Sequence, residues 1–371
     1  MQAILPVIKA LSADAAINVS VVSMEVSRTL CEHYGINAEY LDPQEYQNAP
    51  AVSIATLVER LRPDLILSGS SPARGRLPET PEQYGIIEGR RRGIPSVAVL
   101  DCWGRYHERF VACGDRVSLD LLPDVLCVLD ERCQADLFDL GVPIARMRIT
   151  HNPWLDRVAR ESVLPSIVSP LTQGAGGFRI VFVSQPLAER GMSCSCAYDQ
   201  ERLLRFLLDA LPESSGRAHR ILVWPHPGEQ PDRWRNASHS PRSDVEVLVT
   251  GERGASVLAH VDLVASSHST VIYETLYHGT PAISLRPDGS GLSPMYTDQL
   301  GLSLLFDQLD LLSEYFIKMD PVAERRRLLN AKQQLLARQV FFSDGEATRR
   351  VTETVRQQLG FSTKSVDEVL A

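Results

Sequence analysis

Small polar residues gather in one short segment, residues 266–270, which reads Ser-Ser-His-Ser-Thr. An apolar run suited to a buried strand, 262–267, leads into it, and a predicted helix at 271–277 follows. The first backbone N–H groups of a helix lack internal partners and the helix dipole adds positive charge there, so this turn favours an anion such as phosphate. The side chains expected to add donors around the phosphate are Ser267, His268, Ser269 and Thr270.

Glu274 follows one helical turn later, on the same face of the helix as Thr270. A carboxylate repels a phosphate, so its natural partner is a neutral diol such as a ribose. Phosphate at the turn and ribose at Glu274 together describe a nucleotide. The alternative is that the hydroxyl groups only cap the helix and that Glu274 is solvated.

His226 stands between two prolines directly after a predicted strand at 219–224. Open α/β sheets bind ligands at the carboxyl ends of their strands, so the imidazole is expected to donate to a phosphate or to offset charge on a leaving nucleotide. Ser184 and Gln185 end the strand at 179–184 in the same way and are expected to contact the same ligand. The alternative for His226 is a helix cap or a hydrogen bond to the backbone.

In the N-terminal half, Asp101 follows a predicted strand at 96–100 and opens a loop dense in titratable and aromatic residues. We expect Asp101 to be a catalytic base that takes a proton from an acceptor hydroxyl, with Glu82 and His107 behind it. The alternative is that Asp101 only caps the next turn. The neighbouring residues of the loop are Trp103, Tyr106, Glu108 and Arg109.

These candidates are carried by an alternation of short apolar runs with helices, which is typical of doubly wound parallel sheets. The predicted strands are 17–23, 38–41, 65–68, 96–100, 125–129, 148–150, 179–184, 219–224, 245–250, 262–267 and 282–285. The predicted helices are 1–11, 27–34, 52–61, 82–92, 133–140, 199–211, 255–259, 271–277, 309–317, 323–338 and 347–359.

The predicted fold is α/β, with two Rossmann-like doubly wound domains that face a cleft. We expect an N-terminal domain at 1–157, a Pro-, Ser- and Gly-rich linker at 158–177 and a C-terminal nucleotide-binding domain at 178–340. A helical tail at 341–371 is expected to pack across onto the N-terminal domain. Such a domain normally begins with a strand before its first helix, so we expect its first strand to be absent.

The composition is that of a globular protein, with 44% hydrophobic and 23% charged residues in 371. A net charge of −8 argues against a broad nucleic-acid surface. No apolar run reaches membrane-span length and no leader pattern is visible, so we expect a cytoplasmic protein, with peripheral membrane contact left open. Seven cysteines without a repeated metal-binding spacing suit a reducing compartment, and Cys194 and Cys196 form a lone Cys-x-Cys pair. No cofactor is expected.

The segment WPHPGEQ, residues 224–230, followed about 40 residues later by SSHST, resembles the HP and Ser-Ser/Thr motifs of bacterial GT-B glycosyltransferases. Among these are the polysialyltransferases, the capsule Kdo transferases and the CDP-glycerol polymerases. The segment STVIYETLYHGTPAIS is also similar to the nucleotide-binding unit of other GT-B enzymes, including hydrolysing UDP-GlcNAc 2-epimerases. The resemblance implies that His226, Ser269 and Thr270 hold the donor phosphates and that Glu274 binds the ribose.

The sequence departs from these families in one respect. The acidic D/E-D/E-G motif that supplies the base in polysialyltransferases has no match in the N-terminal half, and residues 343–346, Ser-Asp-Gly-Glu, are on the wrong side of the chain. An Asp-x-Asp metal motif is also absent from the sequence, as the resemblance to metal-independent GT-B enzymes implies.

The function we expect is a metal-independent inverting glycosyltransferase of surface polysaccharide or glycolipid assembly. Its donor would be a UDP-, CDP- or CMP-linked sugar and its acceptor a glycan or a lipid-linked acceptor. Two alternatives stay open: a UDP-GlcNAc 2-epimerase-like enzyme that needs no acceptor, and a non-catalytic nucleotide-sugar-binding protein.

Overall fold

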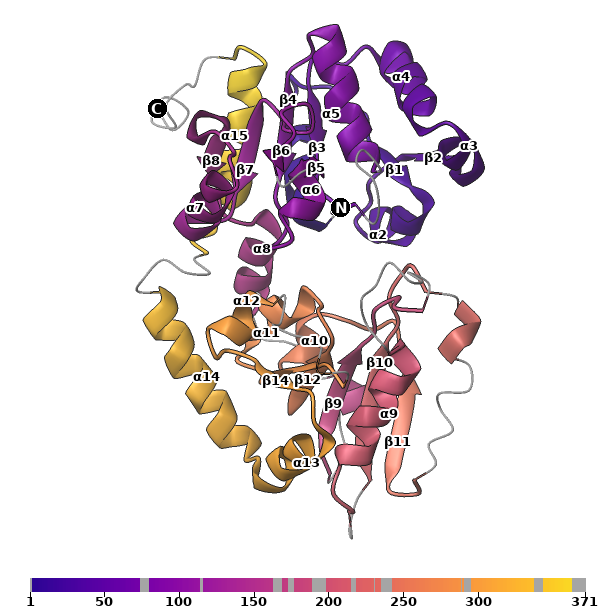
Figure 1. The fold of residues 1–371 in the computed structure, drawn as a ribbon, viewed down its shortest axis with the longest axis vertical. Coiled ribbons are helices and arrows are strands. Elements are labelled where there is room, and N and C mark those ends of the chain that lie inside the picture. The colour runs from indigo at the N-terminus through magenta and orange to yellow at the C-terminus, as the bar shows by residue number, and fades with distance from the viewer. Residues whose placement is uncertain are drawn as a thin grey trace. The chain divides into compact units, whose positions relative to one another are not determined.

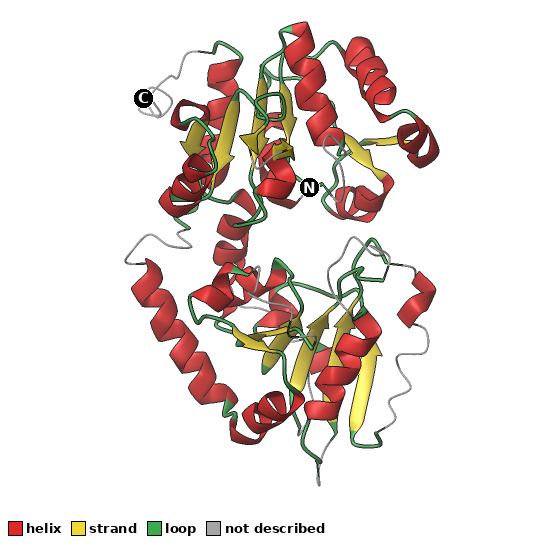
Figure 2. Cartoon of the chain, viewed as in Figure 1, coloured by secondary structure: helices red, strands yellow, loops and turns green. Residues whose placement is uncertain are grey.

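The structure, a computed structural model, divides into two compact units. Unit 1 comprises Met1–Arg157 and Phe341–Ala371, and unit 2 comprises Val158–Val340. Each is built on parallel β-sheet with helices around it (Figures 1 and 2). The residues described are 2–73, 80–113, 116–162, 169–172, 177–188, 198–214, 218–229, 231–234, 242–287, 289, 295–336 and 343–361.

Unit 1 contains a four-stranded parallel sheet in the order β3-β4-β7-β8. These strands are β3 (Ile66–Ser68), β4 (Ser96–Val99), β7 (Val125–Val128) and β8 (Met147–Ile149). All four run in the same direction, so the loops that follow them begin at one edge. The remaining strands form a parallel pair, β1 (Val22–Met24) with β2 (Glu39–Leu41), and an antiparallel pair, β5 (Val111–Cys113) with β6 (Arg116–Val117).

The core of unit 1 joins the two ends of the chain. Val7 of α1 and Val351 of α15 pack with Val97 and Cys127 of the sheet. Asp156 holds the start of α15, because its carboxylate accepts hydrogen bonds from the backbone N–H of Ala347 at 2.6 Å and from the hydroxyl of Ser343. The helices are α1 (Leu5–Ser12), α2 (Arg28–His33), α3 (Pro43–Asn48), α4 (Pro50–Leu61), α5 (Pro81–Arg92), α6 (His107–Phe110), α7 (Glu131–Asp139), α8 (Pro153–Ser162) and α15 (Ala347–Gln358).

Unit 2 contains a six-stranded parallel sheet in the order β11-β10-β9-β12-β13-β14. The chain enters at β9 in the middle, adds β10 and β11 on one side, and then returns to add β12, β13 and β14 on the other. The strand order therefore reverses between β9 and β12, and in open α/β sheets ligands bind at the carboxyl ends of the strands at such a point. The strands are β9 (Arg179–Val183), β10 (His219–Trp224), β11 (Val245–Val249), β12 (Leu263–Ser266), β13 (Ala282–Leu285) and β14 (Leu304–Phe306).

The central strands of unit 2 are almost continuously apolar because both faces of this sheet are covered. On one face, Leu203 and Leu207 of α9 and Phe316 of α13 pack against Ile180 and Phe182 of β9. The helices of this unit are α9 (Gln200–Ala210), α10 (Ala255–Leu258), α11 (Val271–His278), α12 (Tyr296–Gln299), α13 (Leu309–Lys318) and α14 (Pro321–Leu336).

The predicted α/β class with parallel sheets in two domains is confirmed. The predicted strand at 17–23 is wrong for most of its length, since only Val22–Met24 forms a strand. Ile17, Val19 and Val21 alternate as strand residues do, but they pack half-buried against the core of unit 1. Residues 158–162, predicted as linker, continue α8. The rest of that segment lies largely outside the described residues, as do Cys194 and Cys196.

Candidate functional site

Glu229 connects the carboxyl ends of two neighbouring strands of unit 2. Its buried carboxylate accepts hydrogen bonds from the hydroxyl of Ser184, from the backbone N–H of His226 at 3.0 Å and from the indole N–H of Trp234 at 2.8 Å. Ser184 follows β9 and His226 follows β10, so the carboxylate holds the Pro-His-Pro turn beside the end of β9. Gln185, also buried, donates from Nε2 to the carbonyl of Ser184 at 3.0 Å.

The imidazole of His226 has a defined orientation. Its Nδ1 accepts a hydrogen bond from the backbone N–H of Gly228 at 2.9 Å. A neutral imidazole that accepts at Nδ1 carries its proton on Nε2, so that atom is the donor. Gly228 permits the close approach, because a Cβ at that position would lie 3.2 Å from Nδ1. The structure therefore prepares His226 to donate from Nε2.

The hydroxyl-rich turn lies at the carboxyl end of β12, beside β9. Ser266 donates from its hydroxyl to the carbonyl of Val183 at 2.7 Å, which ties the two strand ends together. Ser267 is buried and contacts Nδ1 of His268 at 2.9 Å. The hydroxyl of Ser269 accepts from the N–H of Val271 at 3.3 Å, whereas Thr270 is exposed and its side chain makes no cap. Of these hydroxyl groups, that of Ser269 therefore has the capping role.

Glu274 lies inside the first turns of α11 and is 8% exposed, so the alternative of a solvated carboxylate does not hold. Arg253, in the loop after β11, was not found from the sequence. Its guanidinium stands 5.6 Å from the ring centroid of Trp224 and donates to the carbonyl of Pro225. Desolvation lowers the pKa of Arg253, and the carboxylates of Glu274 and Glu229 oppose this. Arg253 is thus a cation near both buried carboxylates.

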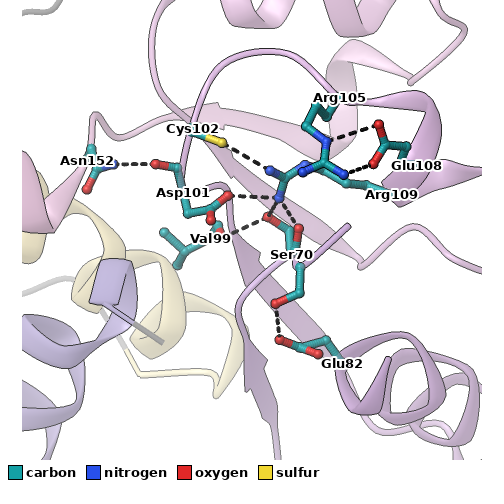
Figure 3. Close-up of polar contacts among 10 residues, drawn as sticks. Ser70, Glu82, Val99, Asp101, Cys102, Arg105, Glu108, Arg109 and Asn152 are labelled. Atoms are coloured by element: carbon teal, nitrogen blue, oxygen red, sulfur yellow. Dashed lines mark hydrogen bonds and ion pairs between the residues drawn. The ribbon is translucent and has the colours of Figure 1, made fainter. Parts of the chain in front are cut away.

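In unit 1, Arg109 is the centre of a polar cluster at the carboxyl edge of the sheet (Figure 3). Its side chain is 1% exposed, and Nη1 lies 2.8 Å from Oδ1 of Asp101. Nη1 also donates to the hydroxyl of Ser70 at 3.1 Å, and Nη2 contacts Sγ of Cys102 at 3.2 Å. The backbone carbonyl of Asp101 accepts from Nδ2 of Asn152 at 2.8 Å. The loops after β3, β4 and β8 are thus linked through these side chains.

Desolvation and neighbouring charges together determine how Asp101 and Cys102 ionise. Desolvation is the largest influence on the pKa of Asp101 and raises it, but the charge and the hydrogen bond of Arg109 contribute to a net lowering of this pKa. Burial and then the charge of Asp101 raise the pKa of the Cys102 thiol to about 12. Asp101 is therefore held as a carboxylate, while Cys102 stays protonated at neutral pH.

The other two residues predicted beside Asp101 have different surroundings. Glu82 accepts a hydrogen bond from the hydroxyl of Ser71 at 2.7 Å, so it lies at the turn that follows β3 (Figure 3). His107 is the first residue of α6 and is exposed. The charged partner of Asp101 is Arg109, which the sequence marks only as one of several loop residues.

Residues 343–346, Ser-Asp-Gly-Glu, lie in the C-terminal half of the sequence, whereas the acidic motif that they resemble is expected in the N-terminal half. In the structure they nevertheless belong to unit 1. Asp344 forms an ion pair with Arg350, whose hydrogen bond lowers the pKa of Asp344 to about 2. His151, which follows β8, also acts electrostatically on Asp344. An Asp-Gly pair therefore lies in the same unit as Asp101, because α15 packs on the sheet of unit 1.

Within the described ranges, no group of three or more His, Cys, Asp or Glu side chains is placed to hold a metal ion. The same residues include no helix with both the length and the apolar character needed to span a bilayer.

Comparison with known proteins shows the fold. No protein-family model matches the sequence, and no curated protein sequence matches it. Among solved structures, the UDP-GlcNAc 2-epimerase of Neisseria meningitidis bound to UDP-GlcNAc has a TM-score of 0.68 at 14% identity, with 96% of each chain covered. The S. aureus MnaA–UDP structure has a TM-score of 0.68 at 13% identity, covering 98% of this chain and 95% of the other. The glycotransferase of kitacinnamycin has a TM-score of 0.57 at 16% identity, with 96% of each chain covered.

These structural neighbours share the GT-B architecture of two domains with parallel sheets. The GT-B fold that the resemblance implies is thereby confirmed, and it is similar to the fold of the UDP-GlcNAc 2-epimerases.

Proposed function

We propose that this protein is a metal-independent inverting glycosyltransferase whose donor is a nucleotide sugar bound in unit 2. The observation that carries the proposal is the orientation of His226, whose Nδ1 accepts from Gly228 and leaves the proton on Nε2. That donor lies at the carboxyl end of β10, the neighbour of β9, and the strand order reverses between β9 and β12. The HP and Ser-Ser/Thr resemblance assigns the same histidine to the donor phosphates.

The donor site is proposed from three features of unit 2. The N-terminus of α11 and the hydroxyl groups of Ser269 and Thr270 would receive the phosphate next to the sugar. The Nε2–H of His226 would donate to an oxygen of the same phosphate. Glu274, buried on α11, would accept from the ribose hydroxyls, since the diol can satisfy a carboxylate that the phosphate would repel.

The chemistry needs more than phosphate binding. A helix terminus and one charge-assisted hydrogen bond stabilise a leaving phosphate by roughly 2–5 kcal/mol together. Enzymes usually lower barriers by about 8–23 kcal/mol. A general base contributes about 10²–10⁴-fold, and in unit 1 we propose Asp101 for this role. It would take the proton of the acceptor hydroxyl as that oxygen attacks C1 of the sugar and the bond from C1 to the phosphate oxygen breaks.

A second candidate is an epimerase acting on a nucleotide sugar. It is favoured by the TM-scores, which are 0.68 for the UDP-GlcNAc 2-epimerase of Neisseria meningitidis and 0.57 for the kitacinnamycin glycotransferase. In both candidates the bond from C1 to the phosphate oxygen of the nucleotide breaks, and they differ in whether an acceptor is required. A nucleotide-sugar-binding protein without turnover is the remaining alternative.

The experiment is product analysis with a panel of UDP-, CDP- and CMP-sugars, each with and without glycan or lipid-linked acceptors. A transferase releases nucleotide and forms a glycoside of inverted configuration only when the acceptor is present. Release of free epimerised sugar without an acceptor would instead show that the protein is an epimerase. Binding of a nucleotide sugar without any turnover would exclude both enzymes and leave the non-catalytic binding protein as the function.

The matched control is His33→Ala, which changes an exposed histidine of unit 1. It should behave like the wild type, whereas His226→Ala should abolish most turnover. Equal activity of the two variants would remove His226 from the proposed reaction.

A further inference from the structure

Four basic side chains form a cluster in unit 2 that the proposed reaction does not use: His260, His278, Arg325 and Lys332. We call this set the basic cluster. His260 precedes β12 and His278 ends α11 shortly before β13 begins. Since β12 and β13 are parallel, these histidines lie toward the amino ends of the strands, at the opposite edge from Ser184 and Ser267. The basic cluster is therefore separate from the proposed nucleotide site.

Helix α14 supplies the other two members and packs directly on the end of α11. Gly279 adopts the left-handed conformation at a φ of +66°, and a Cβ there would lie 2.9 Å from Cδ2 of Leu329. Arg325 and Lys332 are seven residues apart, about two helical turns, so they lie on the same face of α14 as each other. Close packing at Gly279 thus keeps this face against α11.

Hydrogen bonds to backbone carbonyls explain the position of only one residue of the basic cluster, Arg325. Arg325 donates to the carbonyl of His278 at 2.9 Å and to that of Val261 at 3.1 Å, as expected for a cation at a helix C-terminus. Lys332 has no such acceptor among the described residues, and its Nζ stands 5.1 Å from the ring centroid of Tyr277. Helix capping therefore accounts for Arg325 but not for Lys332.

At neutral pH the charges of the basic cluster are those of Arg325 and Lys332. Of the residues that the structure describes, none with a carboxylate forms an ion pair with Arg325 or Lys332. The carboxylate that acts on Arg325 is Asp262, and Arg179 already binds it at 2.7 and 3.0 Å. Burial, followed by the charges of Lys332, Arg325 and His260, lowers the pKa of His278 to about 4. Two like charges held near one another, as those of Arg325 and Lys332 are, are stabilised when an anion joins them.

We propose that the basic cluster is a second ligand site, which binds a phosphate-type anion. The shared chemistry is a phosphate group, carried either by a small molecule or by an anionic lipid headgroup. The side chains of Lys332 and His278 contact the anion, while Arg325 adds charge from its place on the two carbonyls. Binding is coupled to proton uptake by His278, because an anion favours the imidazolium form.

The test follows the ring Hε1 resonance of His278, assigned by its loss in His278→Gln. The probes are inorganic phosphate and, in a separate arm, vesicles with and without phosphatidylglycerol, all at constant ionic strength with chloride as the reference. We expect the titration midpoint of His278 to rise with phosphate by about one unit or more, and Lys332→Met to weaken binding by about tenfold or more. Because the readout is His278 itself, phosphate at the nucleotide site does not mimic the result.

Lys318→Met is the control variant, since Lys318 is exposed and paired with Glu314 on α13. It should bind phosphate as the wild type does. A response to soluble phosphate assigns the site to a small molecule, and a response only to vesicles with phosphatidylglycerol assigns it to a lipid headgroup. No response to either probe, or equal responses of Lys332→Met and the wild type, would overturn the proposal. Each outcome is independent of sugar transfer or nucleotide binding.

Discussion

Glu229 receives the backbone N–H of His226 at 3.0 Å, and this places a buried carboxylate directly behind the proposed phosphate donor. The same carboxylate accepts from Ser184 and Trp234, so one side chain orients residues from three different segments. Its net effect on an anionic ligand is electrostatically unfavourable, which makes the nearby cation Arg253 important for the charge of the site. We interpret Glu229 as a positioning residue for the His226 turn.

Glu229→Ala should therefore destabilise unit 2 and weaken nucleotide binding together, because three donors lose their acceptor. A cost of about 1–3 kcal/mol in the free energy of unfolding is expected. Glu229→Gln should be milder, since the amide oxygen still accepts and the Ser184 hydroxyl can rotate to accept from the amide N–H. Denaturant unfolding and calorimetry with UDP measure the two effects. Glu252→Gln, at an exposed position, is the control, and an Ala variant equal to it would contradict the positioning role.

Arg109 should control the pH at which Asp101 works. The folded protein lowers the pKa of Asp101, so the ion pair contributes stability above the ordinary pKa of an aspartate and loses it as pH falls through the lower folded value. Replacing Arg109 by Met leaves burial to raise this pKa. The acid limb of the pH–rate profile should then move upward by about one unit or more.

Asp101→Asn should lower turnover by about 10²–10⁴-fold if Asp101 is the base, while Ser70 and Cys102 still hold Arg109. Should Arg109→Met fail to fold, Arg109→Gln is the second variant, because it also removes the charge but keeps a hydrogen-bonding side chain. Asp139→Asn, an exposed carboxylate at the end of α7, is the control. A pH profile of the Arg109 variants that superposes on that of the wild type would remove Arg109 from this role.

The sequence predicted the location of those parts of the candidate site that depend on local order, and it did not predict those that depend on distant contacts. Ser184, His226 and residues 266–270 were found because each follows a buried apolar strand, and parallel strands end at one edge. Arg109 contacts Ser70, which is 39 residues away in the sequence, and no spacing pattern predicts such a pair. Glu229 stands only three residues from His226, so its spacing was visible, but its burial was not.

The fold shows the same division. Runs buried on both faces, such as β9 and β12, were predicted almost to the residue. Ile17, Val19 and Val21 alternate like a strand, yet tertiary packing rather than strand pairing buries them. The short α3 has only six residues and few apolar ones, so it gives no helical period to detect.

Asp156 should determine how firmly the C-terminal helix α15 is held on unit 1. It is 1% exposed and accepts from the N–H of Ala347, one of the unpaired donors at the helix start. Asp156→Ala should cost about 1–3 kcal/mol and increase amide hydrogen exchange in α15 more than elsewhere in unit 1. Glu353→Gln changes a carboxylate on the same helix, paired with Arg349, and should leave exchange unchanged. Uniform exchange changes across unit 1 would contradict a local role.

His278 should make the stability of unit 2 depend on pH. Its folded pKa, about 4, lies below the ordinary value of 6.5, so the unfolded chain takes up a proton first as pH falls. Stability is full above pH 6.5 and declines toward pH 4, by at most about 3 kcal/mol. His278→Gln should remove this part of the slope, whereas His33→Gln should keep it. Denaturant unfolding between these two pH values, without phosphate, measures the change in the free energy of unfolding. An equal pH dependence of the two variants would contradict the role of His278.

The two nitrogens of His226 should be separable by substitution. Asparagine can place an acceptor near the position of Nδ1 and keep the hydrogen bond to the N–H of Gly228, but it has no donor at the position of Nε2. Glutamine can reach that donor position but leaves the Gly228 N–H without its acceptor. We therefore expect His226→Asn to retain the wild-type melting temperature and lose UDP affinity by about tenfold or more, because a hydrogen bond to a charged phosphate contributes about 1.5–3 kcal/mol. His226→Gln should retain more of the affinity and lose more of the stability. Thermal unfolding and calorimetry on both variants decide the matter, and the opposite order would place the phosphate contact at Nδ1 instead.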